Sequence, residues 1–154
     1  KMAGGKPIIL ETKEENNFQV DSKELKKLIS DNTKAVLINT PNNPTGAVYS
    51  DETLIEIANI ALKNDLFIIS DEIYESLLYD YKHKSIVSLK NEIKDKTIII
   101  NGVSKAYAMT GWRIGYLACN KELAETITNI QSHATSNPNT IAQYASVKAL
   151  NIDI

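Results

Sequence analysis

The chain has 154 residues, of which 43% are hydrophobic and 23% charged, and its formal net charge at pH 7 is -2. This composition is typical of a globular chain, and the length suits one domain or one lobe of a larger protein. The small net charge gives no reason to expect nucleic acid or an anionic membrane as a partner. The single cysteine, Cys119, excludes an internal disulfide and fits a reducing compartment, so we expect a cytoplasmic protein.

Both ends of the sequence look like cuts. The chain starts at Lys1 without the charged and then apolar layout of a signal peptide, and residues 151–154 stop within a hydrophobic pattern. No apolar run approaches the roughly 18 residues that a membrane span needs. We therefore expect a piece of a longer protein, without a membrane segment.

The first part of the chain predicts two strands and two helices. Residues 7–12 include a short apolar run and predict a strand. Asp21 is placed to cap a helix that follows it, and residues 35–38 predict a buried strand. An amphipathic helix is predicted over 50–63, with Ser50 as its cap. Its expected inward face carries Leu54, Ile57, Ala58 and Ala61.

The second part continues the alternation. Compact apolar runs predict strands at 66–69, 97–100 and 114–118, and helical periodicity predicts helices at 121–134 and 141–150. Short, continuously apolar strands separated mostly by helices are typical of a mainly parallel sheet covered on both faces. We therefore expect an α/β fold, a three-layer sandwich, and no domain boundary inside the chain.

Polar residues follow three of the predicted strands. They are residues 39–46 (Asn-Thr-Pro-Asn-Asn-Pro-Thr-Gly), residues 70–74 (Ser-Asp-Glu-Ile-Tyr) and residues 101–105 (Asn-Gly-Val-Ser-Lys). In open α/β sheets, ligands bind just beyond the carboxyl ends of the strands, and parallel strands place those ends on one edge. The three loops are therefore expected to build one site.

Each candidate side chain also has a simpler interpretation. Asn43 lies in a loop whose composition is that of a turn. Asp71 directly follows an apolar strand, where a carboxylate is costly unless paired, but it could instead cap the next segment. Tyr74 could simply be packed. Lys105 could be solvated, and Arg113, which lies between two glycines, could form a surface ion pair.

Taken together, these side chains suit pyridoxal 5'-phosphate (PLP). The amine of Lys105 can form a Schiff base with an aldehyde. Asp71 beside the ring nitrogen would hold it protonated, which strengthens the ring as an electron sink. The remaining roles would be filled by hydrogen bonds to the phenolic oxygen from Asn43 and Tyr74, which lower the Schiff-base pKa, and by phosphate contacts from Ser104 and Arg113.

Residues 102–115 (Gly-Val-Ser-Lys-Ala-Tyr-Ala-Met-Thr-Gly-Trp-Arg-Ile-Gly) resemble the PLP-attachment signature of class I aminotransferases, the aspartate aminotransferase family of fold type I. The spacing of eight from Lys105 to Arg113 belongs to that signature. Residues 42–46 resemble the family's Asn-Pro-Thr-Gly loop, and residues 70–74 resemble its Asp-x-x-Tyr element. The resemblance extends over almost the whole chain.

The resemblance implies catalytic roles for Lys105, as cofactor-binding lysine and proton carrier, and for Asp71 and Tyr74. It implies cofactor contacts for Asn43 and Arg113, with Ser104 as a weaker phosphate ligand. Residues 1–154 would form part of the PLP-binding large domain, without its N-terminal part and without the C-terminal small domain. The family's homodimers imply a second copy as partner.

The implied activity is amino transfer between an amino acid, with aspartate or a similar one as donor, and a 2-oxo acid, by a ping-pong route. Three alternatives stay open: a PLP-dependent C–S β-lyase, the PLP-binding sensor domain of a transcription regulator, and a folded but inert piece. No metal site is expected, because His83 and His133 lie in no metal-ligand spacing, and the segment 82–84 is expected to be a solvated loop.

Overall fold

The computed structural model describes residues 4–80 and 82–152, so the terminal residues behind the expectation of cut ends lie partly outside it. In this part of the chain, four strands form one sheet in the order β1-β2-β3-β4. The strands are β1 (Ala35–Asn39), β2 (Phe67–Asp71), β3 (Thr97–Gly102) and β4 (Gly115–Ala118). The first three are parallel, and β4 is antiparallel to β3. The predicted α/β class with a mainly parallel sheet is confirmed.

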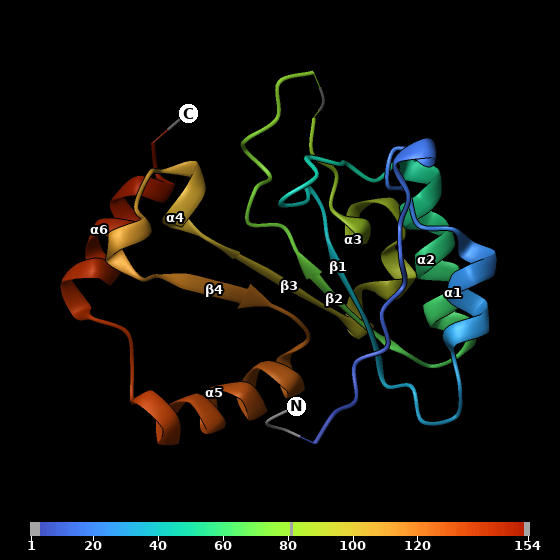
Figure 1. Ribbon diagram of the computed structural model, residues 1–154. Helices are drawn as coiled ribbons and strands as arrows, with labels where there is room; N and C mark the ends of the chain where they lie inside the picture. Colours follow the sequence, from blue (N-terminus) through green and yellow to red (C-terminus); the bar gives the residue numbers. More distant parts are fainter. Residues whose placement is uncertain (1–3, 81, 153–154) are drawn as a thin grey trace.

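Helices connect and flank the strands (Figure 1). The α-helices are α1 (Ser22–Leu28), α2 (Asp51–Lys63), α3 (Ile86–Leu89), α4 (Val103–Ala106), α5 (Lys121–Thr135) and α6 (Thr140–Leu150). Three short 3-10 helices lie at Glu14–Asn16, Asn91–Lys96 and Thr110–Trp112. The predicted caps are confirmed: the Asp21 side chain accepts hydrogen bonds from backbone N–H groups at the start of α1, and Ser50 does so for α2.

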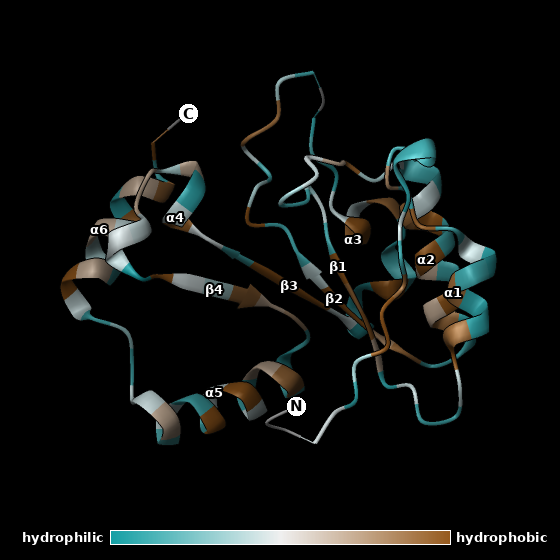
Figure 2. Ribbon diagram, in the orientation of Figure 1, coloured by the Kyte–Doolittle hydropathy of each residue, from teal (hydrophilic) through white to brown (hydrophobic). Residues whose placement is uncertain are grey.

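The hydrophobic core lies between α2 and one face of the sheet. Every residue of the predicted inward face of α2 is buried. Ile38 of β1 and Ile68 of β2 are buried in the same cluster, and the strands are hydrophobic along much of their length (Figure 2). Burial of these aliphatic side chains anchors β1 and β2, so the loops at their carboxyl ends start from fixed positions.

The predicted strand at residues 7–12 is wrong. The segment is extended but forms no strand, and Ile8 and Ile9 are exposed, while only Leu10 packs against the core. An apolar run becomes a strand only where another strand pairs with its backbone, and β1 pairs with β2 alone in the described residues.

The prediction of a wholly buried strand at 35–38 is also wrong in part. Ile38 is buried, but Leu37 is exposed, because successive strand residues point to opposite faces of the sheet. Ile100 of β3 and Leu117 of β4, which pair in register, are likewise exposed on large parts of their surface. In the described residues the helix-covered face therefore holds the core, while the other carries exposed apolar side chains.

Candidate active site

Asp71 is the last residue of β2 and lies in register between Asn39 of β1 and Ile100 of β3. Its half-buried side chain accepts a hydrogen bond at Oδ1 from the backbone N–H of Ile73, at 3.2 Å. Its backbone carbonyl accepts hydrogen bonds from the Thr40 N–H and from Asn39 Nδ2, each at 3.2 Å. Within the described residues, Oδ2 makes no hydrogen bond, so one carboxylate oxygen is available to a ligand.

The loop after β1 is held by amide side chains. Asn39 Oδ1 accepts hydrogen bonds from Asn42 Nδ2 at 3.1 Å and from the backbone N–H of Asn43 at 3.2 Å. Asn42 Oδ1 in turn accepts hydrogen bonds from the backbone N–H and the hydroxyl of Thr45. These bonds replace a backbone ladder at the strand end and fix the place of Asn43.

Three of the predicted site residues meet beyond the strand ends. Asn43 Nδ2 donates a hydrogen bond to Tyr74 Oη at 3.2 Å. Lys105 Nζ lies 5.4 Å from the centroid of the Tyr74 ring, within the range of a cation–π contact. The three residues come from the loops after β1, β2 and β3, as expected from the convergence of parallel strand ends.

The position of Lys105 depends on Gly102, the last residue of β3. Lys105 lies in α4, directly after β3, and β3 ends at Gly102, where β4 comes very close. A Cβ atom at Gly102 would lie 2.9 Å from the Ile114 carbonyl oxygen and 3.1 Å from Gly115 Cα. A side chain at this position would therefore push β3 and β4 apart, and glycine lets the two strands pair.

Arg113 and Ser104 are not bonded to this group. Arg113 is exposed, has a left-handed backbone conformation with φ of 56°, and donates a hydrogen bond from Nη1 to the Thr110 carbonyl at 2.8 Å. It lines an open cavity of about 400 Å³ with Gly111, Trp112, Asn139 and Ala142. Ser104 is half-buried next to Lys105, and its hydroxyl makes no hydrogen bond within the described residues.

The available groups fit PLP by their chemistry. They offer an amine on Lys105, a free carboxylate oxygen on Asp71, amide and phenol groups on Asn43 and Tyr74, and a guanidinium on Arg113. An amine can attach an aldehyde, a carboxylate can pair with a protonated ring nitrogen, and a guanidinium matches a phosphate.

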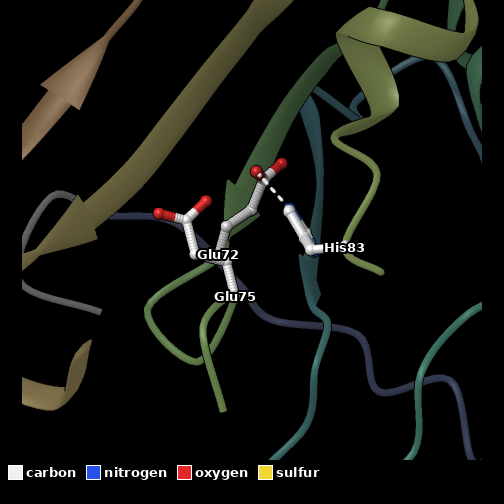
Figure 3. Close-up of side chains that lie close together, drawn as sticks. All are labelled: Glu72, Glu75 and His83. Carbon is white, nitrogen blue, oxygen red and sulfur yellow. Dashed lines mark hydrogen bonds and ion pairs between the residues drawn. The ribbon is translucent and has the colours of Figure 1, made fainter. Parts of the chain in front are cut away.

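A second polar group, which the sequence analysis missed, surrounds Glu72, the residue after Asp71; Figure 3 shows Glu72 with Glu75 and His83. The Glu72 side chain is only 3% exposed, and its Oε1 accepts hydrogen bonds from the hydroxyls of Ser70 and Ser85, each at 2.9 Å. Its Oε2 lies 2.8 Å from His83 Nε2. A carboxylate accepts hydrogen bonds, so Nε2 is the donor in this pair. We refer to Ser70, Glu72, His83 and Ser85 as the Glu72 network.

This network corrects the prediction of a solvated loop at 82–84. Lys82 and Lys84 are exposed, but the His83 side chain is only 13% exposed and is paired with a buried carboxylate. The sequence could have indicated that Glu72 is buried and paired, because Glu72 follows the same apolar strand as Asp71 and a buried carboxylate needs partners. Two of its partners, His83 and Ser85, lie 11 and 13 residues further along the chain, and no local pattern identifies them.

Glu75 extends the group, since ligand-type atoms of Glu72, Glu75 and His83 all lie within 4.8 Å of one another (Figure 3). Both oxygens of Glu72 already accept hydrogen bonds from protein groups, so the burial of this carboxylate is explained by the Glu72 network itself.

Burial of the Tyr116 side chain on β4, with the charge of Glu75 as a second cause, raises the pKa of Tyr116.

None of the helices within residues 4–80 and 82–152 combines the length and the hydropathy that a membrane crossing requires.

Comparison with known proteins places this chain in a family. The model of the family described as aminotransferase class I and II matches residues 1–154. An aspartate aminotransferase of Bacillus sp. (strain YM-2) is 52% identical over 152 residues, which are 98% of this chain and 39% of that protein. The chain thus spans about two fifths of the length of the relatives it matches.

Solved structures agree with the sequence relatives. The aspartate aminotransferase of Thermotoga maritima superposes with a TM-score of 0.94 at 47% identity, over 99% of this chain and 40% of that one. The aromatic aminotransferase of Pyrococcus horikoshii also gives 0.94, at 44% identity, over 99% of this chain and 41% of that one. The chain belongs to the class I and II aminotransferases, in the aspartate aminotransferase family with fold type I.

Proposed function

We propose that this chain carries the PLP-attachment site of an aminotransferase that transfers an amino group between an amino acid and a 2-oxo acid. The observation that carries the proposal is the meeting of Lys105, Tyr74 and Asn43 beyond the strand ends, where β2 ends with Asp71. A family whose members depend on PLP has the matching chemistry, and the relatives' names favour amino transfer over a β-lyase or a sensor domain.

The side chains would divide the work as follows. Lys105 would hold the cofactor through its amine and, once that amine is released by substrate, would move the proton at the amino acid's α-carbon. When bound, PLP supplies the electron sink that makes this proton acidic. Asp71 would pair with the ring nitrogen, and Tyr74 would hold the phenolic oxygen. The remaining cofactor contacts would come from Asn43, Ser104 and Arg113.

The donor that we propose is aspartate or a similar amino acid, with a ping-pong exchange against a 2-oxo acid. The support is the similarity to aspartate aminotransferases, although an aromatic aminotransferase is nearly as similar. We further propose that residues 1–154 are part of the PLP-binding large domain and that the active protein is a cytoplasmic homodimer. These last points rest on the family membership.

The first test is chemical labelling. PLP is added, the absorption spectrum is recorded, the adduct is reduced with borohydride, and the labelled lysine is mapped by mass spectrometry. We expect a single label on Lys105, which is lost in Lys105→Ala. Lys96→Ala is a matched control, because Lys96 Nζ also lies over an aromatic ring, 5.2 Å from the Phe67 centroid, but at the amino ends of β2 and β3. It should keep the label on Lys105.

Label scattered over many lysines, with no defined absorption band, would contradict the proposal. The donor is tested on the PLP-loaded protein by adding aspartate or phenylalanine and following the loss of the PLP band. Faster loss with phenylalanine than with aspartate would contradict the proposed donor but not the proposed chemistry.

A further inference from the structure

We propose that Glu72 is a positioning residue, which acts through the Glu72 network to hold Tyr74 against Lys105. The proposal rests on the proposed function, because it concerns the site where PLP would be held. It gives a role to the buried carboxylate of Glu72, which is not among the proposed cofactor contacts.

The Glu72 network joins the two ends of the connection between β2 and α3, residues 72–85. Glu72 directly follows Asp71 at the end of β2, whereas Ser85 directly precedes α3 and His83 lies two residues before Ser85. The hydrogen bonds from Ser85 and His83 to the Glu72 carboxylate therefore tie the two ends of the connection 72–85 together. Figure 3 shows the His83 ring reaching toward the Glu72 carboxylate at the end of β2.

Outside the Glu72 network, the described part of the connection is held by few bonds. The Glu72 N–H donates to the Ile100 carbonyl, Asn43 Nδ2 donates to Tyr74 Oη, and Lys84 pairs with Asp51. The outer part of the connection is open to solvent, with Tyr79 at 96% exposure, and Leu77 is exposed as well. The backbone hydrogen bonds within it are short-range turns, from the Glu75 N–H to the Glu72 carbonyl and from the Leu77 N–H to the Tyr74 carbonyl. Segments with few buried contacts open easily, so their position depends on where their ends are tied.

Tyr74 lies two residues after Glu72, inside the tied end of this connection. Its hydroxyl accepts the Asn43 hydrogen bond, and its ring lies 5.4 Å from Lys105 Nζ. Without the Glu72 carboxylate, the hydroxyls of Ser70 and Ser85 and the His83 ring would lose their common acceptor. The connection would then loosen at Tyr74, and the phenol would lose its fixed place next to Lys105.

In the PLP-bound protein, the pH midpoint of the PLP absorption band can be measured, and a change in overall stability alone does not shift it. The pH midpoint of the absorption band of PLP at Lys105 reports the pKa of the linked nitrogen, which a hydrogen bond from Tyr74 to the phenolic oxygen lowers. We expect Tyr74→Phe to raise this midpoint by about one pH unit, a tenfold change in proton affinity. Glu72→Ala should raise it in the same direction, and the double variant should add little to Tyr74→Phe alone.

Three further variants sharpen the test. Glu72→Gln keeps an oxygen that can accept from both serines, so it should return most of the midpoint to the starting value. Lys84→Ala removes the exposed ion pair between Lys84 and Asp51, on the same segment but outside the Glu72 network, and should leave the midpoint unchanged. Ser85→Ala, which removes one bond at the far end, should give a smaller shift of the same sign.

A second measurement does not need the cofactor. In the PLP-free protein, Glu72→Ala should speed amide hydrogen exchange at Glu75 and Leu77 by at least about tenfold relative to the amides of α2, and Lys84→Ala should not. Absence of a PLP band at Lys105 in the unaltered protein would overturn the proposed function, and exchange alone would then decide whether Glu72 positions Tyr74.

The inference is overturned by any of three results. They are an unchanged PLP midpoint in Glu72→Ala, a midpoint shift that adds fully to that of Tyr74→Phe, or unchanged exchange at Leu77. If Glu72→Ala does not fold, Ser85→Ala takes its place in the same measurements, and an unchanged midpoint there overturns the inference equally.

Discussion

Two regions of the molecule bury their apolar residues very differently. The core region, residues 20–93, contains β1, β2 and α1 to α3, and its aliphatic side chains form one buried cluster. The outer region, residues 115–150, contains β4, α5 and α6; no residue of α5 is buried, and every residue of β4 is exposed. Figure 1 shows α1 and α2 on one side of the strands and α5 and α6 beyond β4.

The difference between the core region and the outer region shows which site residues are attached to the packed core. Asn43, Asp71 and Tyr74 lie at or just after the ends of strands in the core region. The Asn43 N–H donates to Asn39 Oδ1, the Asp71 carboxylate accepts from the Ile73 N–H, and Asn43 Nδ2 donates to Tyr74 Oη. Arg113 lies two residues before the outer region and is exposed, and its Nη1 donates a hydrogen bond to the Thr110 carbonyl. Lys105 lies between the two regions, so its place depends on how β3 and β4 meet.

The largest expected effect compares one isoleucine in each region. Ile57 of α2 is 1% exposed, and Ile141 of α6 is 72% exposed. We expect Ile57→Ala to lower the free energy of unfolding by about 2–5 kcal/mol, because it leaves a cavity in the cluster. Ile141→Ala, the matched control, should change it by less than about 0.5 kcal/mol. Urea unfolding measures both, and equal losses would contradict the division into two regions.

A smaller effect is expected where the regions join. Gly102→Ala places a Cβ atom against the backbone of Ile114 and Gly115, so β3 and β4 must move apart. We expect a loss of about 1–3 kcal/mol in the free energy of unfolding and faster amide exchange in β4. Gly111→Ala is the control, because a Cβ atom there meets nothing within 4 Å. If the two variants behave alike, the close approach at Gly102 is not what holds β4.

The smallest effect concerns alkaline pH. Tyr49 packs against the core cluster, and burial raises its pKa above the ordinary value of 10.0. Because the folded state favours the neutral phenol, this contribution to stability is complete below pH 10.0 and is lost as the pH rises through the folded-state pKa. We expect Tyr49→Phe to lose less stability than the unaltered protein above about pH 10.

The control for this prediction comes from the outer region. Tyr144→Phe replaces an exposed tyrosine of α6 and should leave the alkaline loss of stability unchanged. Thermal unfolding followed between pH 8 and 11 would compare the three proteins, with about pH 10 as the point where they should begin to diverge. A parallel decline of Tyr49→Phe and the unaltered protein would show that Tyr49 does not cause the alkaline loss.

The sequence by itself determined the features that depend on residues close together in the chain. The caps at Asp21 and Ser50, the inward face of α2, and the strands β1 to β3 follow from local periodicity and side-chain chemistry. It also indicated that residues 39–46, 70–74 and 101–105 would meet, because parallel strands end on one edge of the sheet. The structure brings Asn43, Tyr74 and Lys105 together there.

Only the tertiary structure decided what depends on partners far away in the chain. Residues 7–12 are apolar enough for a strand but find no strand to pair with, and Leu37 has the pattern of a buried residue but lies on the exposed face. The antiparallel direction of β4 and the pairing of Glu72 with His83 are of the same kind. Burial and hydrogen bonding belong to pairs of groups, so a residue's own type sets its needs, and the fold sets which neighbour meets them.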